Sequence, residues 1–181
     1  MEGLSRYGVP PSIASEKFAG FGIPPMLLIL IAGLVAGPTI NALFAFGEEL
    51  GWRGFLQKEL AYLGFWKSSF LIGLIWGMWH IPLVIQGYNY PQHPFIGIGM
   101  VIIFAILLSP LFNYIRIKSN SVIAVAIMHG TLNAVAGISA AFVKGGSDLT
   151  VGIQGVSGFI ILITINVMLI KIISTNRDDM I

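Results

Sequence analysis

Residues 24–64 read PPMLLILIAGLVAGPTINALFAFGEELGWRGFLQKELAYLG, an apolar stretch with two glutamates and an arginine near its middle. A run of about 20 apolar residues is long enough to cross a bilayer as a helix. Charged side chains inside such a helix are costly and usually mark function. Gly37 and Pro38 predict a kink or break, because proline removes a helical hydrogen bond. The stretch therefore predicts a kinked membrane helix that carries a polar cluster.

The remainder of the chain contains four further apolar segments, each close to the length of a membrane span. They comprise residues 65–85, 95–114, 122–143 and 151–173. Short linkers rich in Gly, Pro, Asn and Ser separate them, as expected for turns. We expect an all-α, polytopic transmembrane helix bundle of about five spans. Residues 24–174 would form its core, residues 1–23 a polar lead-in or interfacial segment, and residues 175–181 a polar tail.

The composition supports a lipid-covered protein. The 181 residues are 56% hydrophobic and 10% charged, with a mean hydropathy of +0.86, whereas a soluble domain has about 25% charged residues. The basic residues form no clustered patch of the kind that binds nucleic acid. The absence of cysteine excludes disulfides, thiolate metal sites and a cysteine nucleophile. The expected partners are therefore the lipid bilayer and a membrane-associated protein or peptide.

Three Gly-x-x-x-Gly pairs recur within the apolar segments. They are Gly33 with Gly37, Gly47 with Gly51, and Gly73 with Gly77. Such pairs let helix backbones approach closely in lipid. We interpret all three as packing features of a tight bundle.

The charges in residues 47–60 can be divided by helical spacing. Glu49 and Arg53 are four residues apart and can form an ion pair on one helix face. Glu48 lies about 100° away around the helix, so it needs a partner from another helix or must be protonated. The alternative is an amphipathic surface helix, but Gly51 and Trp52 leave little polar face around the charges.

Two histidines lie inside other apolar segments. His80 falls in the second segment, and His129 falls in the fourth, one turn before Asn133. A single intramembrane histidine is usually structural, but two of them together with an unpaired Glu48 favour proton-transfer chemistry. The Asn133 amide could stabilise an oxyanion or hold helices together. The helical rise places both histidines and Glu48 at a similar depth, so tertiary packing could bring them together.

Other polar residues are interpreted as structural. His93, in the loop between the second and third segments, is expected to be an exposed bystander. Asn41, Asn113 and Asn166 are expected to be packing or interface residues.

The polar residues form three spaced motifs, and their pattern resembles a known family. The motifs are Glu48-Glu49-x-x-x-Arg53, Trp76-x-x-x-His80 and His129-x-x-x-Asn133. Their order on separate apolar segments resembles the CPBP family of intramembrane proteases, which includes type II CAAX prenyl endopeptidases and bacterial Abi-type proteins. Trp76 stands where phenylalanine is common in the family. Members usually have about eight membrane helices, so we expect this chain to correspond to the catalytic core of a longer protein.

The resemblance implies an intramembrane endopeptidase that hydrolyses a peptide bond of a membrane-associated protein or peptide. In the family's mechanism, the positions of Glu48 and His80 activate a water, those of His129 and Asn133 stabilise the oxyanion, and Glu49 and Arg53 form a supporting ion pair. The family is often described as metalloproteases. Glu48, His80 and His129 could bind Zn²⁺ with an open position for water, and the sequence leaves open whether the water is metal-bound. The His-Glu-x-x-His motif of ordinary zinc proteases is absent.

Two other functions remain open from the sequence. Intramembrane Glu, His and Arg also serve proton relays in transporters, although transporters often show inverted repeats and none is visible in this sequence. A non-catalytic binding or immunity protein of the same fold is the second alternative, against which the complete set of Glu, His and Asn residues argues.

The loops predict the orientation of the chain in a bacterial cell membrane. With five crossings, six basic residues fall on the side of the C-terminus and three on the other side. Because the basic side is usually cytoplasmic, we expect the C-terminus and the mouth of the site to face the cytoplasm. A Ser119→Cys variant should be shielded from an impermeant thiol reagent in intact cells, whereas Ser147→Cys should react. The reverse labelling would overturn this orientation, and labelling at both positions would contradict five spans.

Overall fold

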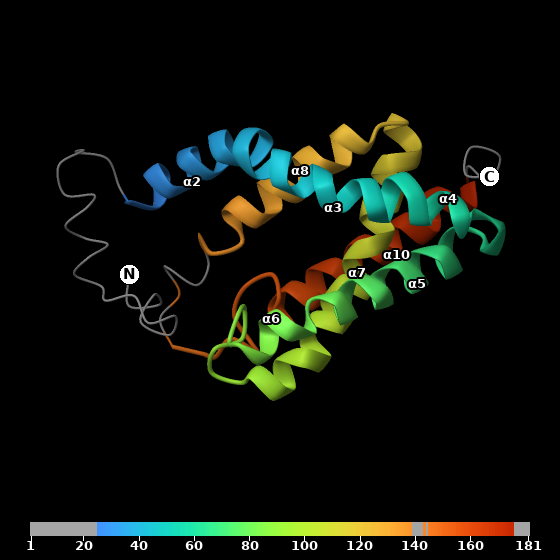
Figure 1. Cartoon of the computed structure of the whole chain (residues 1–181). Coiled ribbons are helices and arrows are strands. Elements are labelled where there is room, and N and C mark those ends of the chain that lie inside the picture. The colour runs from blue at the N-terminus through green and yellow to red at the C-terminus, as the bar shows by residue number, and fades with distance from the viewer. Residues whose placement is uncertain (1–24, 139–142, 144, 176–181) are drawn as a thin grey trace.

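The computed structural model describes residues 25–138, 143 and 145–175. Within those residues the chain is helical and contains no strand, and the helices form an elongated bundle (Figure 1). This confirms the predicted all-α transmembrane fold. The predicted lead-in, residues 1–23, and residues 176–181 of the predicted tail lie outside the described residues.

The first helical stretch changes its winding twice. Its segments are α2 (Pro25–Ala36), the π-helical turn η2 (Gly37–Asn41), α3 (Ala42–Glu49), the π-helical turn η3 (Leu50–Leu56) and α4 (Gln57–Glu59). The disruption predicted at Gly37 and Pro38 therefore takes the form of a π-helical turn, and the helix continues. The second π-helical turn was not predicted. It begins directly after Glu49 and contains Arg53, and π-helical turns within helices frequently occur at functional sites.

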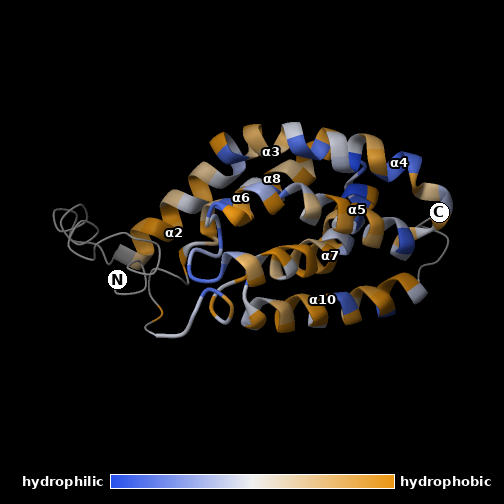
Figure 2. Ribbon diagram, turned by 60° about the horizontal axis from the view of Figure 1, so that its bottom comes forward, coloured by the Kyte–Doolittle hydropathy of each residue, from blue (hydrophilic) through white to orange (hydrophobic). Residues whose placement is uncertain are grey.

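The other helices follow after short turns. They are the 3₁₀ turn η4 (Ala61–Leu63), α5 (Phe65–Trp79), α6 (Ile81–Ile85), α7 (Pro94–Ser119), α8 (Val122–Val135) and α10 (Val156–Thr175). In Figure 2, apolar residues predominate on α2 and α10, and polar residues gather around α4. Apolar residues also cover outward faces, where Phe44 is 75% exposed and Phe95 81% exposed. These faces suit lipid contact.

Four helical stretches of the described chain are long and apolar enough to cross a membrane. They are Met26–Glu59, Phe65–Ile85, Pro94–Ser119 and Val156–Thr175. The fourth predicted segment, residues 122–143, differs because its helix α8 has only 14 residues, about 21 Å of helix. Residues 139–142 of that segment lie outside the described residues. The bundle thus combines four long helical stretches with one shorter helix that carries His129.

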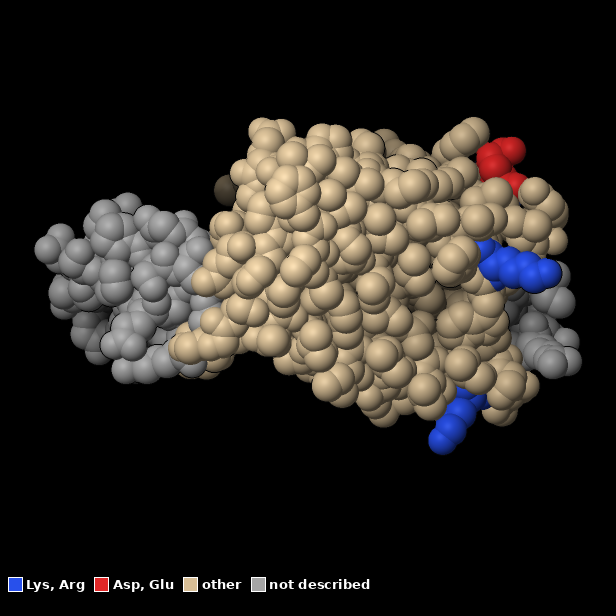
Figure 3. Space-filling view, turned by 90° about the horizontal axis from the view of Figure 1, so that it is seen from below, with Lys and Arg blue, Asp and Glu red and all other residues tan. Residues whose placement is uncertain are grey.

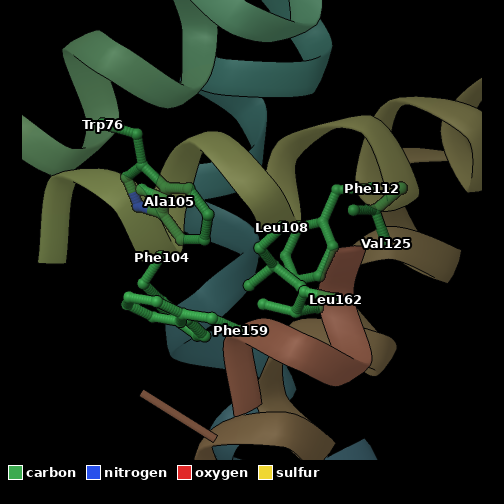
Figure 4. Packing of buried hydrophobic residues seen from close by; sticks show 8 residues of the cluster. All are labelled: Trp76, Phe104, Ala105, Leu108, Phe112, Val125, Phe159 and Leu162. Atoms are coloured by element: carbon green, nitrogen blue, oxygen red, sulfur yellow. The ribbon is translucent and has the colours of Figure 1, made fainter. Parts of the chain in front are cut away.

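A hydrophobic cluster ties α5, α7, α8 and α10 together (Figure 4). Its members are Trp76, Phe104, Ala105, Leu108, Phe112, Val125, Phe159 and Leu162. The cluster brings the tryptophan of the second motif into the centre of the bundle. Trp76 is 3% exposed, and its burial determines which face of α5 points towards the centre of the bundle.

Close backbone contacts occur at two of the three predicted glycine pairs. A Cβ at Gly73 would lie 2.7 Å from the Ala105 carbonyl oxygen, and one at Gly77 would lie 2.7 Å from Ile102 Cα. Gly37 similarly faces the backbone of Thr131 in α8. Gly47 and Gly51 differ, because among the described residues a Cβ at either position would meet nothing within 4 Å. Spacing alone identifies the helix face but not whether another helix covers it.

We expect Gly73→Ala to destabilise the bundle by about 1–3 kcal/mol, because the added methyl group would push α5 away from the α7 backbone. Gly99→Ala is the matched control, since a Cβ at Gly99 in α7 would meet no atom within 4 Å. That control should be neutral or slightly stabilising because alanine favours helix more than glycine does. Thermal unfolding in detergent micelles measures both changes. Equal stability of the two variants would contradict the close α5–α7 contact.

Candidate active site

The site is built around a buried ion pair between Glu49 and Arg53. Both side chains are 0% exposed, and Arg53 Nη1 donates to both carboxylate oxygens of Glu49 at 3.1 Å. This confirms the ion pair predicted from the four-residue spacing. The amphipathic surface helix considered for residues 47–60 is wrong for this pair, because neither side chain contacts solvent.

The arginine is held by polar groups of α7 as well. Arg53 Nε donates to Asn113 Oδ1 at 3.3 Å, and Nη2 donates to Ser109 Oγ at 3.4 Å. The Asn113 amide donates in turn to Ser69 Oγ at 2.9 Å. Asn113 is thus more than the packing residue we expected. The spacing of Ser109 and Asn113 by one turn in an apolar segment was a signal of a polar face that sequence reasoning did not use.

Aromatic rings enclose the arginine on two sides. Its guanidinium carbon lies 4.8 Å from the centre of the Trp76 ring and 4.7 Å from that of Phe112. Such cation–π contacts are strongest where water is excluded. They help to compensate Arg53 for the loss of hydration, together with its hydrogen bonds.

The ion pair extends to the fourth predicted segment through His129. His129 Nδ1 lies 2.8 Å from Glu49 Oε1, and the histidine is 3% exposed. A carboxylate can only accept, so Nδ1 carries the proton and Nε2 of the neutral ring is left as an acceptor. Glu49 therefore sets the tautomer and the orientation of His129.

Trp76 organises the other two ionisable groups. Its indole Nε1 donates to Glu48 Oε2 at 3.3 Å, and its carbonyl oxygen accepts from His80 Nδ1 at 2.8 Å. Glu48 thus has a partner from another helix, as expected, and that partner is an indole. His80, like His129, is left with Nε2 as the free acceptor. The sequence suggested only that Trp76 packs beside His80, which it also does, with ring centres 5.7 Å apart.

A cavity of about 350 Å³ brings the predicted residues together. Four of the six candidates line it: Glu48, His80, His129 and Asn133. Glu49 and Arg53 do not line it and lie behind His129. Asn133 is exposed, and within the described residues its side chain makes no hydrogen bond. From the helical rise we expected Glu48, His80 and His129 at a similar depth, and all three line this one cavity.

The cavity extends away from the basic end of the bundle. Its lining continues to Tyr88, Asn89 and Gln154, which lie in loops beside α6, at the opposite end from α4 (Figure 1). The lining thus runs towards the end opposite the one where we expect the mouth, and the side from which the site opens stays a prediction. Counting residues along a helix gives the depth of a group in the membrane, but not which side chains lie between that group and the surface. On the basic side those side chains include Arg53 and Asn113, which are both 0% exposed.

His93 has a side chain that is 37% exposed, in line with the exposure we expected, but it is not a bystander. Its Nδ1 lies 2.7 Å from Asp148 Oδ1, and Asp148 has a side chain that is 0% exposed. Asp148 Oδ2 also accepts from the Gln92 backbone N–H at 2.7 Å. The contact joins the loop before α7 to the loop before α10. His93 lies outside the lining of the 350 Å³ cavity.

Comparison with known proteins agrees with this geometry. Residues 22–135 match a family model described as type II CAAX prenyl endopeptidase, Rce1-like. The chain belongs to this family. The matched region contains all six candidate residues, so the resemblance seen in the motifs is confirmed at the level of the family.

A curated relative of this Rce1-like chain is named CAAX prenyl protease 2, from Methanococcus maripaludis. The two are 29% identical over 117 residues, which cover 61% of this chain and 39% of the relative. The chain therefore aligns with well under half the length of that relative. No solved structure matches the chain.

The proposed zinc ligands of the Rce1-like chain do not converge as the structure places them. Among the described residues, no three His, Asp or Glu side chains come together as a group that could hold a metal ion. Glu48 is bonded to the Trp76 indole, and His129 uses Nδ1 for Glu49. The three side chains line one cavity, but as they lie in the described structure they are not grouped around a common point.

The Glu49–Arg53 pair should show strong coupling in a double-mutant cycle. Glu49→Gln or Arg53→Met alone leaves an unpaired buried charge and should cost about 3–5 kcal/mol of stability. The double variant should lose less than the sum of the two single losses. Thermal unfolding in micelles measures the cycle.

The control cycle uses Glu59→Gln and Lys67→Met, which change two exposed residues near the same end of the bundle. Its losses should be small and additive. Additive losses at Glu49 and Arg53 would show that the two residues do not stabilise each other.

Proposed function

We propose that the chain is an intramembrane endopeptidase in which Glu48 and His80 activate the water that attacks the peptide bond. The observation that carries this proposal is the shared cavity, to which α3 contributes Glu48, the junction of α5 and α6 contributes His80, and α8 contributes His129. These groups lie within an apolar bundle where ionisable side chains are costly to bury. Membership of the Rce1-like family supports proteolysis as the reaction.

Glu48 is suited to act as a general base. Its Oε2 accepts from the Trp76 indole, which leaves the other carboxylate oxygen to accept a proton from water. His80 Nε2 is a second acceptor on the same cavity, since Nδ1 is bonded to the Trp76 carbonyl. As the water oxygen attacks the carbonyl carbon, its proton passes to this Glu48–His80 pair. The pair then returns a proton to the leaving amine.

His129 and Asn133 would stabilise the oxyanion of the tetrahedral intermediate. The Asn133 amide lines the cavity and has two N–H donors for this purpose. Because Nδ1 of His129 already donates to Glu49, its ring can donate from Nε2 only as an imidazolium. Arg53 fixes the Glu49 carboxylate, so the ion pair acts as a positioning unit behind His129.

The substrate we propose is a membrane-anchored protein or peptide. A second groove of about 380 Å³ adjoins the cavity and is lined by Gly51, Trp52, Phe55, Glu48 and Trp79, among others. Glu48 and Trp79 line both spaces. A chain segment lying against the outer face of the bundle could therefore reach Glu48 from the lipid. The apolar groove also suits a lipid-modified peptide such as a prenylated one.

Glu48→Gln and His80→Ala should each lower the cleavage rate of a membrane-anchored peptide by at least about 100-fold, because general-base catalysis contributes 10²–10⁴-fold. Glu59→Gln serves as the matched control, since Glu59 is exposed on the same helical stretch and should leave the rate unchanged. Mass spectrometry of the products measures cleavage, and thermal unfolding establishes that each variant is folded. Wild-type turnover by folded Glu48→Gln protein would refute the mechanism.

A zinc-dependent version of the site makes a different prediction in the same assay. If Glu48, His80 and His129 bind Zn²⁺, a membrane-permeable chelator stops cleavage and added Zn²⁺ restores it. Full cleavage by metal-free protein supports the Glu48–His80 water instead. If the protein moves solute across vesicles but cleaves no peptide, it is a transporter.

A further inference from the structure

A second cavity, of about 690 Å³, lies at the basic end of the bundle. The ends of the long helical stretches meet around it, since Lys58, Phe65, Arg116 and Ile173 all line it. Its size falls within the range of about 300–1,000 Å³ that is usual for ligand sites. In the view of Figure 3, the Lys and Arg side chains of the described surface gather at one end of the molecule. Charges at helix ends mark the level of the lipid headgroups.

Two polar atoms in the residues that line this cavity are buried without a partner. Among the described residues, Gln57 Oε1 and Arg116 Nε have no hydrogen bond. The rest of each side chain is held, because Gln57 Nε2 donates to the Asn113 carbonyl and Arg116 Nη1 donates to Asn120 Oδ1. Such atoms are uncommon in native proteins, and a bound water or ion that pairs with them is one of their ordinary explanations. Neither atom is accessible as the side chains lie, so a ligand that accepts from Arg116 and donates to Gln57 must turn both side chains towards the cavity.

The charges around the cavity select an anion. Lys58 and Arg116 both line it, while Glu59 does not. Arg53 forms part of the wall, but its guanidinium already donates to Glu49, Asn113 and Ser109. The cationic donors available to a ligand are therefore those of Arg116 and Lys58.

The remaining wall is apolar. Phe65, Ile117 and Ile173 contribute to it, together with the ring of Tyr62. A small hydrophilic anion would leave these surfaces uncovered, whereas a lipid tail would cover them. Basic pockets between membrane helices at the headgroup level are suited to anionic lipids.

We propose that this cavity binds an anionic phospholipid whose headgroup carries a hydroxyl, such as phosphatidylglycerol. The phosphate accepts from Arg116 Nε and faces the Lys58 ammonium. A glycerol hydroxyl donates to Gln57 Oε1, and an acyl chain lies along Phe65 and Ile173. The site is separate from the proposed catalytic cavity and does not depend on the chemistry proposed there.

The test measures lipid binding to the full chain in detergent micelles by native mass spectrometry, with phosphatidylglycerol, phosphatidylmethanol and phosphatidylcholine of the same acyl chains. Wild-type protein should bind phosphatidylglycerol about tenfold more tightly than phosphatidylcholine, because charge-assisted hydrogen bonds are the stronger kind. Phosphatidylmethanol, which has the charge but no headgroup hydroxyl, should fall between them. Glycerol 3-phosphate, the headgroup without tails, should bind far more weakly than phosphatidylglycerol.

Variants connect the binding to named atoms. Arg116→Gln should remove most of the preference for phosphatidylglycerol, and Arg116→Lys, which keeps the charge but lacks the Nε donor, should restore it only in part. Gln57→Leu should lower phosphatidylglycerol affinity to that of phosphatidylmethanol and leave phosphatidylmethanol unchanged. Lys67→Gln is the matched control, because Lys67 is exposed near the same end but does not line the cavity. Thermal unfolding verifies that each variant is folded.

Three results would overturn the proposal. Equal wild-type affinity for phosphatidylglycerol and phosphatidylcholine would reduce the site to an unselective apolar groove. An equal loss in Lys67→Gln and Arg116→Gln would show general surface attraction rather than a built site. Binding of glycerol 3-phosphate as tight as that of the lipid would mean that the cavity takes a soluble phosphate and not a phospholipid.

Discussion

The buried contact between Glu49 and Arg53 is the constraint on which the arrangement of the bundle depends. Two charges with no exposed surface are tolerated only when their remaining donors and acceptors are satisfied. For Arg53, that requirement draws in the polar face of α7 through Asn113. For Glu49, it draws in α8 through His129. One ion pair within a single helix thereby determines which faces of two other helices must meet it.

Trp76 holds Glu48 and His80 in place, each through a hydrogen bond to a different atom of the tryptophan. Its indole N–H supports Glu48, and its carbonyl oxygen orients His80. Its ring also stacks on Arg53. Trp76 therefore connects Glu48 and His80, which we propose act on water, to the Glu49–Arg53 ion pair. A phenylalanine at this position would keep the ring and the carbonyl but lose the indole donor. The tryptophan therefore adds a hydrogen bond to Glu48 that a phenylalanine could not make.

The two ends of the bundle have different chemistry. On one side of the ion pair, the cavity that contains Glu48 and His80 continues towards the loops around Tyr88. On the other side, Arg53 closes the base of the basic cavity proposed to hold a phospholipid. A single buried arginine thus separates the space proposed for proteolysis from the space proposed for lipid. Arg53 lines the basic cavity and, through Glu49, is bonded to the His129 that lines the other cavity.

The sequence by itself determined the class of the protein and the identity of the candidate residues. Long apolar segments can only be helices that cross lipid, because backbone groups must be satisfied within each segment. Spacing within one helix likewise predicted the Glu49–Arg53 pair. It could not predict the hydrogen bonds that Asn113 and Trp76 make across helices, that no described residue packs against Gly47, or the direction in which the cavity extends. Those features depend on how helices far apart in sequence rotate and pack against one another, and local periodicity does not contain that information.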